Sequence, residues 1–200
     1  MIEVAERMFA ERGLDGVSMR DIASAAGQKN NSAVQYHFGG RDGLIFEVFR
    51  RRMATVNAAR EKFIATIDAE GRGEDVRALV EAVVLPLADY IAERGVDSYY
   101  AQFLARVSPA IDFDEPDMAA ISAGSREVSR RLMGVLGHLP RRVAVARVDL
   151  ILNMAVSALA TFEQRHASGN IVVHTSFEDT VHHVIDMSVG ALGAPCSQTD

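Results

Sequence analysis

Residues 18–44 decide the fold of this chain, and they read SMRDIASAAGQKNNSAVQYHFGGRDGL. Ser18 can cap a helix with its hydroxyl, and Asp21 follows three residues later, at the spacing of a capping box. Gly27 offers a left-handed stop for that helix. A second short helix is expected over residues 31–38. Two short helices joined by a turn that contains glycine have the proportions of a helix-turn-helix unit.

The second helix of this unit carries an unusual number of uncharged polar side chains. Val34 and Phe38 lie four residues apart and are expected to face the core together. Asn31, Ser32 and Gln35 then lie on the opposite face. Side-chain amides can pair bidentately with adenine in the major groove, without binding every phosphate. The polar face therefore predicts a surface that reads DNA bases.

Helical periodicity continues on both sides of this unit. A first helix is expected over residues 2–12, ending at Gly13, and a long fourth helix runs to about Asp68. Further helices are expected at roughly 74–94, 97–107, 117–137, 141–167 and 176–192. The prediction is an all-α protein with three parts: a three-helix DNA-binding domain over 1–45, a larger helical bundle over 46–193 for ligand binding and dimerisation, and a polar tail over 194–200.

Composition and charge fit a helical protein with a sizeable core. The chain has 200 residues, of which 48% are hydrophobic and 24% charged. The net charge of −6 argues weakly against nucleic acid, but residues 1–53 carry +1 and the remainder −7. Any DNA affinity must therefore come from locally placed groups.

The sequence predicts a cytoplasmic protein. Cys196 is the only cysteine, which excludes an intramolecular disulfide and fits a reducing compartment. The N-terminus is acidic and amphipathic, unlike a secretion signal. The most apolar run, residues 143–160, is interrupted by Arg147, Asp149 and Asn153, so no membrane span is expected.

Two stretches resemble the TetR-type transcriptional regulators. They are ERMFAERGLDGVSMRDIASAAG at residues 6–27 and YHFGGRDGL at residues 36–44. The resemblance is strong over about residues 3–48, and beyond them it rests on the number and length of the helices. It implies an N-terminal helix-turn-helix domain and a bundle that binds a small ligand and pairs with a second copy.

The resemblance also implies roles for individual residues in DNA binding. Arg20 corresponds to a position that contacts a base or a phosphate, and Tyr36, His37 and Arg41 to phosphate clamps. Positions that meet bases are Asn31, Ser32, Ala33 and Gln35. Arg41 also opens the fourth helix, where backbone N–H groups favour a phosphate. The structural alternative for His37 is a packed core histidine.

Three departures from the family pattern bear on these assignments. The segment from Gly27 to Phe38 is one residue longer than usual, so either Asn30 or Asn31 meets the bases and the other caps the helix. Gln35 stands where the family often has Tyr. The basic arm that usually precedes the first helix is absent: either a preceding segment is missing, or affinity depends on fewer phosphate contacts.

The bundle is expected to hold the effector and the dimer interface. An apolar cavity with a few polar groups suits a mostly apolar organic molecule. The candidate lining is Tyr99, Tyr100, Phe103, Arg106, Met118, Met154, Ser157 and Phe162, for which plain core packing is the alternative. A helix that is apolar all round must be buried on every side, so residues 141–192 are expected to pair with a second copy. The candidate interface is Val148, Ile151, Leu152, Ala155, Leu159, Val181, Val184, Ile185, Ser188 and Leu192.

Other functions find less support in the sequence. It lacks the G-x-S-x-G, H-E-x-x-H and P-loop motifs, so no enzyme, catalytic residue or cofactor is predicted. No metal site is expected, because His182 and His183 point about 100° apart on a helix. The polar repeat Asp149, Asn153, Ser157 and Thr161 is either an exposed edge or a polar lining. An interaction module without DNA-reading ability stays the third possibility beside a homodimeric repressor and an enzyme.

Overall fold

A computed structural model describes residues 1–28, 36–95, 98–110, 115–169 and 176–196, and every regular element in these ranges is helical. This agrees with the predicted all-α class. The helices are α1 Ile2–Arg12, α2 Met19–Ala25, α4 Arg41–Ala69, α5 Val76–Arg94, α6 Tyr100–Val107, α7 Pro116–Ile121, α8 Ala123–Val135, α9 Arg141–Ala167 and α10 Phe177–Gly193, with a short 3-10 turn over Ser108–Ala110.

The N-terminal unit forms as its local signals predict. The backbone N–H of Asp21 donates to the hydroxyl of Ser18, and the Asp21 carboxylate accepts from the backbone of Ser18, which completes the capping box. Gly27 ends α2 with a φ of +70°, a conformation that costs glycine little. Ile22 of α2 and Phe9 of α1 are fully buried and form the core of this unit.

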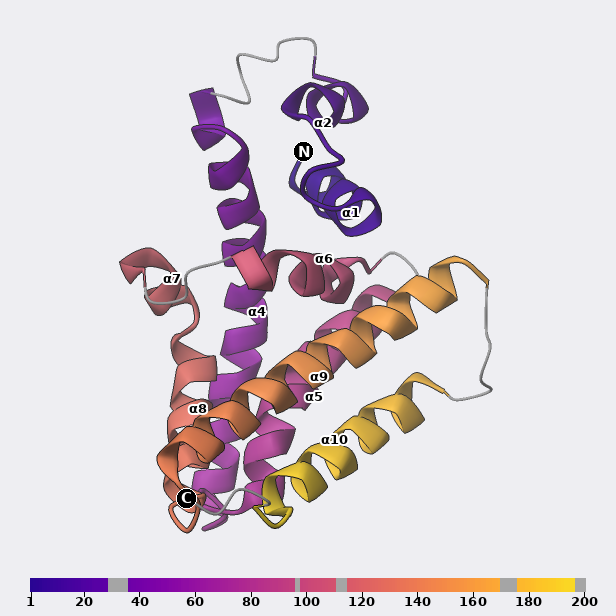
Figure 1. Ribbon diagram of the computed structural model, residues 1–200. Helices are drawn as coiled ribbons and strands as arrows, with labels where there is room; N and C mark the ends of the chain where they lie inside the picture. The colour runs from indigo at the N-terminus through magenta and orange to yellow at the C-terminus, as the bar shows by residue number, and fades with distance from the viewer. Residues whose placement is uncertain (29–35, 96–97, 111–114, 170–175, 197–200) are drawn as a thin grey trace.

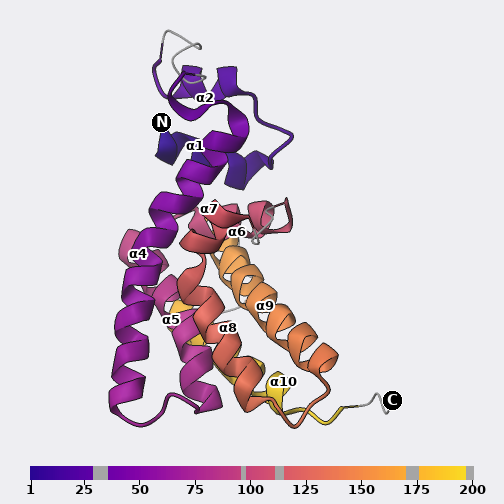
Figure 2. The same ribbon diagram turned by 90° about the vertical axis from the view of Figure 1, so that its left-hand side faces the viewer.

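Helix α4 joins the N-terminal unit to the bundle. It runs for 29 residues from the level of α2 down one side of the molecule (Figures 1 and 2). The predicted domain boundary at residues 45/46 therefore falls inside one continuous helix. Its upper part packs on α1 and its lower part on α5 and α8, so a single rigid element touches both halves of the protein.

The bundle is built around α5 and α9, with α10 beside them (Figure 1). The single helix expected at 117–137 is two helices, because the chain turns at Ser122. Two side-chain hydrogen bonds to backbone carbonyls accompany this turn. The hydroxyl of Ser122 donates to the carbonyl of Met118 at 2.7 Å, and the amide of Asn57 donates to the carbonyl of Ile121.

Helix α9 is the apolar helix noted in the sequence. By length and composition it is the one described helix that could cross a membrane. Core helices of soluble proteins satisfy the same criterion, and α9 packs against α6 along one side and α10 along another. These contacts cover the apolar residues of α9 that face the bundle, whereas Val145 and Leu150 stay exposed.

Candidate functional site

The described part of the helix-turn-helix unit exposes the predicted DNA contacts. Arg20 lies exposed on α2, and Tyr36 has 87% of its surface exposed. His37 is also exposed, which excludes the core-histidine alternative. Its ring lies 5.5 Å from that of Tyr36, edge to face. The predicted base contacts Asn31, Ser32, Ala33 and Gln35 lie outside the described residues, as does Asn30.

Glycines fix the start of α4 beside these residues. Gly39 and Gly40 have φ values of +69° and +121°, so the chain makes a sharp bend that side chains would strain. A Cβ on Gly43 would lie 1.7 Å from the carbonyl oxygen of Phe38, which leaves no room for any side chain. Gly43 is therefore required for the first turn of α4 to pass so close to Phe38, and Gly39 and Gly40 are favoured in the bend before it.

Arg41 is the first residue of α4, at the end of the helix where backbone N–H groups attract anions. Its Nη2 lies 3.5 Å from Oδ1 of Asp15, and the Asp15 side chain is fully exposed. Such a long, solvated ion pair contributes little and can exchange for a phosphate. Arg41 is therefore placed on the same end of the molecule as Tyr36 and His37.

Residues 1–48 match the family model of bacterial regulatory proteins, tetR family. Over this stretch the chain is similar to the DNA-binding domain of the TetR family. A curated relative, the HTH-type transcriptional repressor KstR2 of Rhodococcus jostii (strain RHA1), is 32% identical over 84 residues. These residues are 42% of this chain and span only 38% of that relative. The homologues are transcriptional regulators rather than enzymes.

The TetR-type fold extends through the bundle. The regulator PfmR from Thermus thermophilus superposes with a TM-score of 0.53 and 19% identity, covering 94% of this chain and 96% of that one. The ketosteroid transcriptional regulator KstR2 of Mycobacterium tuberculosis gives 0.52 and 16%, covering 94% and 91%. At these identities the similarity establishes the fold.

A cavity of about 300 Å³ lies in the TetR-type bundle between α4, α5, α8 and α9. Its wall is mainly aliphatic, with a small set of polar groups. The charged groups are Arg60, Arg126 and Asp149, and the hydroxyl or amide groups come from Ser108, Ser122, Ser125, Ser129 and Asn153. The α4 residues on the wall are Phe49, Met53, Val56 and Arg60, spaced along one face of that helix.

None of the eight residues in the lining predicted from the sequence lies on this cavity. Tyr100 and Phe103 are fully buried and stack on each other within the core. Arg106 donates from Nε to the carbonyl of Ala10 at 3.3 Å and thus links α6 to α1. Phe162 packs edge to face on Phe177.

The other four predicted lining residues also lie elsewhere. Tyr99 lines a cleft beside α1, Met118 lies near the start of α4, Met154 is half-buried, and Ser157 is exposed. Of the polar repeat on α9, Asp149 and Asn153 do reach the cavity wall, whereas Ser157 and Thr161 do not. All four residues are exposed, so the exposed-edge interpretation holds for the whole repeat, and Asp149 and Asn153 in addition lie on the cavity wall.

Arg60 is the residue of this site that the sequence analysis missed. It is 4% exposed and projects from α4 toward α5. Its Nε donates to the carbonyl of Ala82 at 3.0 Å. Pro86 lies four residues after Ala82 within α5 and has no N–H to donate to that carbonyl. Arg60 therefore supplies the hydrogen bond that the proline removes. The sequence does hold one indication of this role: Arg60 falls on the face of α4 that its apolar periodicity predicts to be buried.

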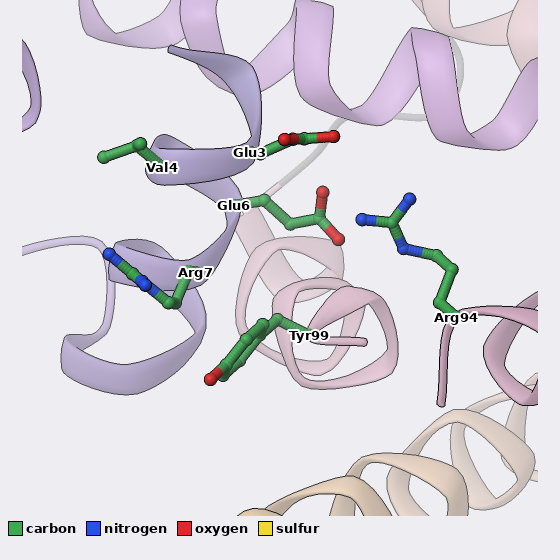
Figure 3. Close-up of a pocket in the computed structure, with 6 residues that line it drawn as sticks. All are labelled: Glu3, Val4, Glu6, Arg7, Arg94 and Tyr99. Carbon is green, nitrogen blue, oxygen red and sulfur yellow. The ribbon is translucent and has the colours of Figure 1, made fainter. Parts of the chain in front are cut away.

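A second cluster lies at the junction between α1 and the bundle (Figure 3). Glu6 is 2% exposed, and its carboxylate accepts from Nε of Arg52 on α4 at 2.7 Å. Figure 3 shows the guanidinium of Arg94, from the end of α5, turned toward the same carboxylate. Burial raises the pKa of Glu6, and Arg52 and then Arg94 act in the opposite direction. Three helices thus meet at one buried charge cluster.

The residues predicted for the dimer interface face the interior of a single chain. Nine of the ten are buried there, and Leu152 lies on the cavity wall. Packing against their own bundle explains their apolar character without a partner. The large apolar side chains that α9 and α10 do expose are Val145, Leu150 and Met187.

Within the described residues, no group of three or more His, Cys, Asp and Glu side chains is arranged to hold a metal ion. His182 and His183 are both exposed on α10. The structure therefore offers no described metal centre to compete with the cavity as a ligand site.

Proposed function

We propose that this protein is a cytoplasmic, homodimeric repressor that binds operator DNA and is released from it by a small organic effector. One observation carries the proposal: the cavity wall includes one face of α4, and the first residue of that same helix is Arg41 at the DNA-binding end. An effector in the cavity would thus press directly on the helix that positions the DNA-binding unit.

The mechanism follows from the two-fold pairing that DNA reading requires. Two copies present their reading helices to half-sites about 34–36 Å apart. An effector that binds better to a tilted arrangement of α4 shifts the population toward it, and the separation of the two reading helices then no longer fits the operator. By linkage, operator DNA weakens effector binding by the same factor.

The dimer interface is proposed on the exposed face shared by α9 and α10. Ala146, Leu150 and Ser157 recur at helical spacing on the outer side of α9, and His183 and Met187 do so on α10. Leu150 and Met187 are 64% and 62% exposed, which is unusual for large apolar side chains. Small and apolar residues on two adjacent helices suit a four-helix interface with a second copy.

Selection of genomic DNA fragments by the purified protein tests the proposal. We expect one or a few fragments to be retained over random DNA, and an inverted repeat to be protected within them. If random and genomic fragments are retained equally, the protein binds DNA without sequence specificity. If neither is retained, it is an interaction module rather than a DNA-binding repressor.

Two substitutions separate phosphate clamps from base readers. Arg41→Ala is expected to weaken binding to every sequence alike and to lower the salt dependence by roughly one phosphate contact. Gln35→Ala is expected to cost about 1–3 kcal/mol on the operator and to relax the preference at one base pair. Fluorescence anisotropy with operator and random duplexes, over a series of salt concentrations, measures both effects. If Gln35→Ala loses the same binding free energy on the operator and on the random duplex, Gln35 does not read a base.

A further inference from the structure

The cavity contains a buried positive charge without an acidic partner. Arg60 is 4% exposed, and among the described residues no carboxylate lies within ion-pair distance of it. Burial lowers its pKa to about 10, so the guanidinium remains charged at neutral pH. A buried charge is costly unless it is paired, so an anion bound in the cavity would stabilise this arrangement.

The hydrogen bonds of Arg60 leave part of the guanidinium available. Besides the bond to Ala82, Nη1 donates to Oδ1 of Asn57 at 2.5 Å and Nη2 reaches the carbonyl of Val83 at 3.4 Å. A guanidinium has five N–H groups, so each terminal nitrogen keeps one N–H beyond these three bonds. Two N–H groups on adjacent nitrogens match the two oxygens of a carboxylate.

Neighbouring residues hold this guanidinium in place. A Cβ added to Gly124 of α8 would lie 3.0 Å from Oδ1 of Asn57 and 3.5 Å from Cδ of Arg60. The absence of a side chain at Gly124 therefore lets α8 approach closely. The Asn57 amide is itself fixed by its bond to the carbonyl of Ile121. An anion bound here would meet a preorganised donor.

We propose that the effector is a small organic acid with an apolar body, whose carboxylate pairs with Arg60. The inference rests on the proposed function, because it names the chemical class of the effector for the same cavity. The aliphatic wall from α5 and α9 takes the body of the molecule, and the serines of α8 offer hydroxyls beside the charged end.

Volume and charge favour a monocarboxylic acid over larger anions. A cavity of about 300 Å³ lies at the lower end of the range for ligand pockets, too small for a nucleotide-linked thioester. The other charged groups on the wall, Arg126 and Asp149, are exposed and of opposite sign, so they add no net charge. The buried guanidinium then balances a single negative charge.

Calorimetric titration of the full chain tests the proposal with matched pairs of probes. The probes are hexanoate, decanoate and phenylbutanoate, each compared with its uncharged primary amide. We expect at least one acid to bind about tenfold more tightly than its amide. The preference for the acid over its amide is expected to be lost in Arg60→Met. It is expected to be kept in part in Arg60→Lys, because lysine keeps the positive charge but lacks the paired N–H donors of the guanidinium.

A second variant guards against misfolding of Arg60→Met, which also loses the donor to Ala82. Ser125→Asp keeps Arg60 and places a carboxylate on the half-buried wall of α8. It is expected to weaken binding of the acid more than binding of the amide. Amides that bind as tightly as their acids, a series in which no acid binds, or a preference retained in folded Arg60→Met would each overturn the proposal.

DNA selection without any probe keeps the two proposals separate. If the protein selects an operator but shows no acid preference, the assignment of Arg60 fails and the repressor function stands. If no operator is selected, the repressor function fails, while the titrations still decide whether Arg60 binds a carboxylate.

Discussion

Replacement of Arg52 by Met is expected to lower the free energy of unfolding by about 3–5 kcal/mol, because it removes the cation that hydrogen-bonds to the buried carboxylate of Glu6 and leaves only the weaker influence of Arg94. Glu6 is 2% exposed, and the Arg52 side chain is only 14% exposed, so water can replace the lost partner only in part. Oε1 of Glu6 already lacks a hydrogen bond within the described residues. Urea denaturation at neutral pH measures the loss.

The loss is expected to depend on pH in a defined direction. Burial raises the pKa of Glu6, and removal of Arg52 removes the largest influence that lowers it. A carboxyl whose pKa is higher in the folded than in the unfolded state stabilises the fold when protonated, and that contribution disappears as pH rises through the folded pKa. Arg52→Met should therefore lose more stability at about pH 8 than at about pH 5.

Arg51→Met is the matched control, one residue away on the same helix. Arg51 forms a surface ion pair with Glu47 at 2.6 Å, and its side chain is 57% exposed. Glu47 keeps Arg50 as a second partner. The control should cost less than about 1 kcal/mol. Similar losses for the two variants, or no difference between the two pH values for Arg52→Met, would show that the Glu6 charge cluster does not stabilise the junction.

Glutamate at both Leu150 and Met187 is expected to convert the protein to a monomer and to reduce operator affinity by on the order of 10²–10⁴. In a two-fold dimer each of these positions would occur twice, so the double variant places four carboxylates in an apolar contact. Each monomer then reads a single half-site and loses the benefit of the linked second one. Sedimentation velocity and operator titration measure the two effects.

Val145→Glu provides the comparison on the same helix. Val145 is 50% exposed, but it lies five residues before Leu150 and hence about 140° around α9. We expect this variant to remain a dimer with unchanged operator affinity. If the double variant sediments as a dimer, or if Val145→Glu dissociates equally, the interface does not lie on the proposed face.

Local structure in this chain could be predicted because its signals are local. The Ser18–Asp21 capping box, the left-handed Gly27 and the start of α4 at Arg41 depend on residues within one or two turns. Helix α9 begins and ends where the periodicity places it, at Arg141 and Ala167. The DNA-binding unit could also be assigned, since its motif fills one continuous stretch.

The cavity could not be predicted, because it depends on how distant helices pack. Aromatic residues near Tyr100 suggested a lining, yet Tyr100 and Phe103 pack on Tyr90 and Phe9 as core. The same periodicity describes a stripe that faces a cavity and one that faces a neighbouring helix. The apolar stripes of α9 and α10 were likewise assigned to a partner chain, although their own bundle covers them.

The proline within α5 constrains which amino-acid substitutions this chain can accept during evolution. Pro86 leaves the carbonyl of Ala82 without its backbone donor, and Arg60 supplies one from another helix. Pro86→Ala alone restores a helical donor that then competes with Arg60, while loss of Arg60 alone leaves a buried carbonyl unsatisfied. Substitutions at the two positions should therefore be tolerated together more readily than singly. Across homologous chains, the two positions are expected to co-vary, and a double-mutant cycle should give a non-zero coupling energy.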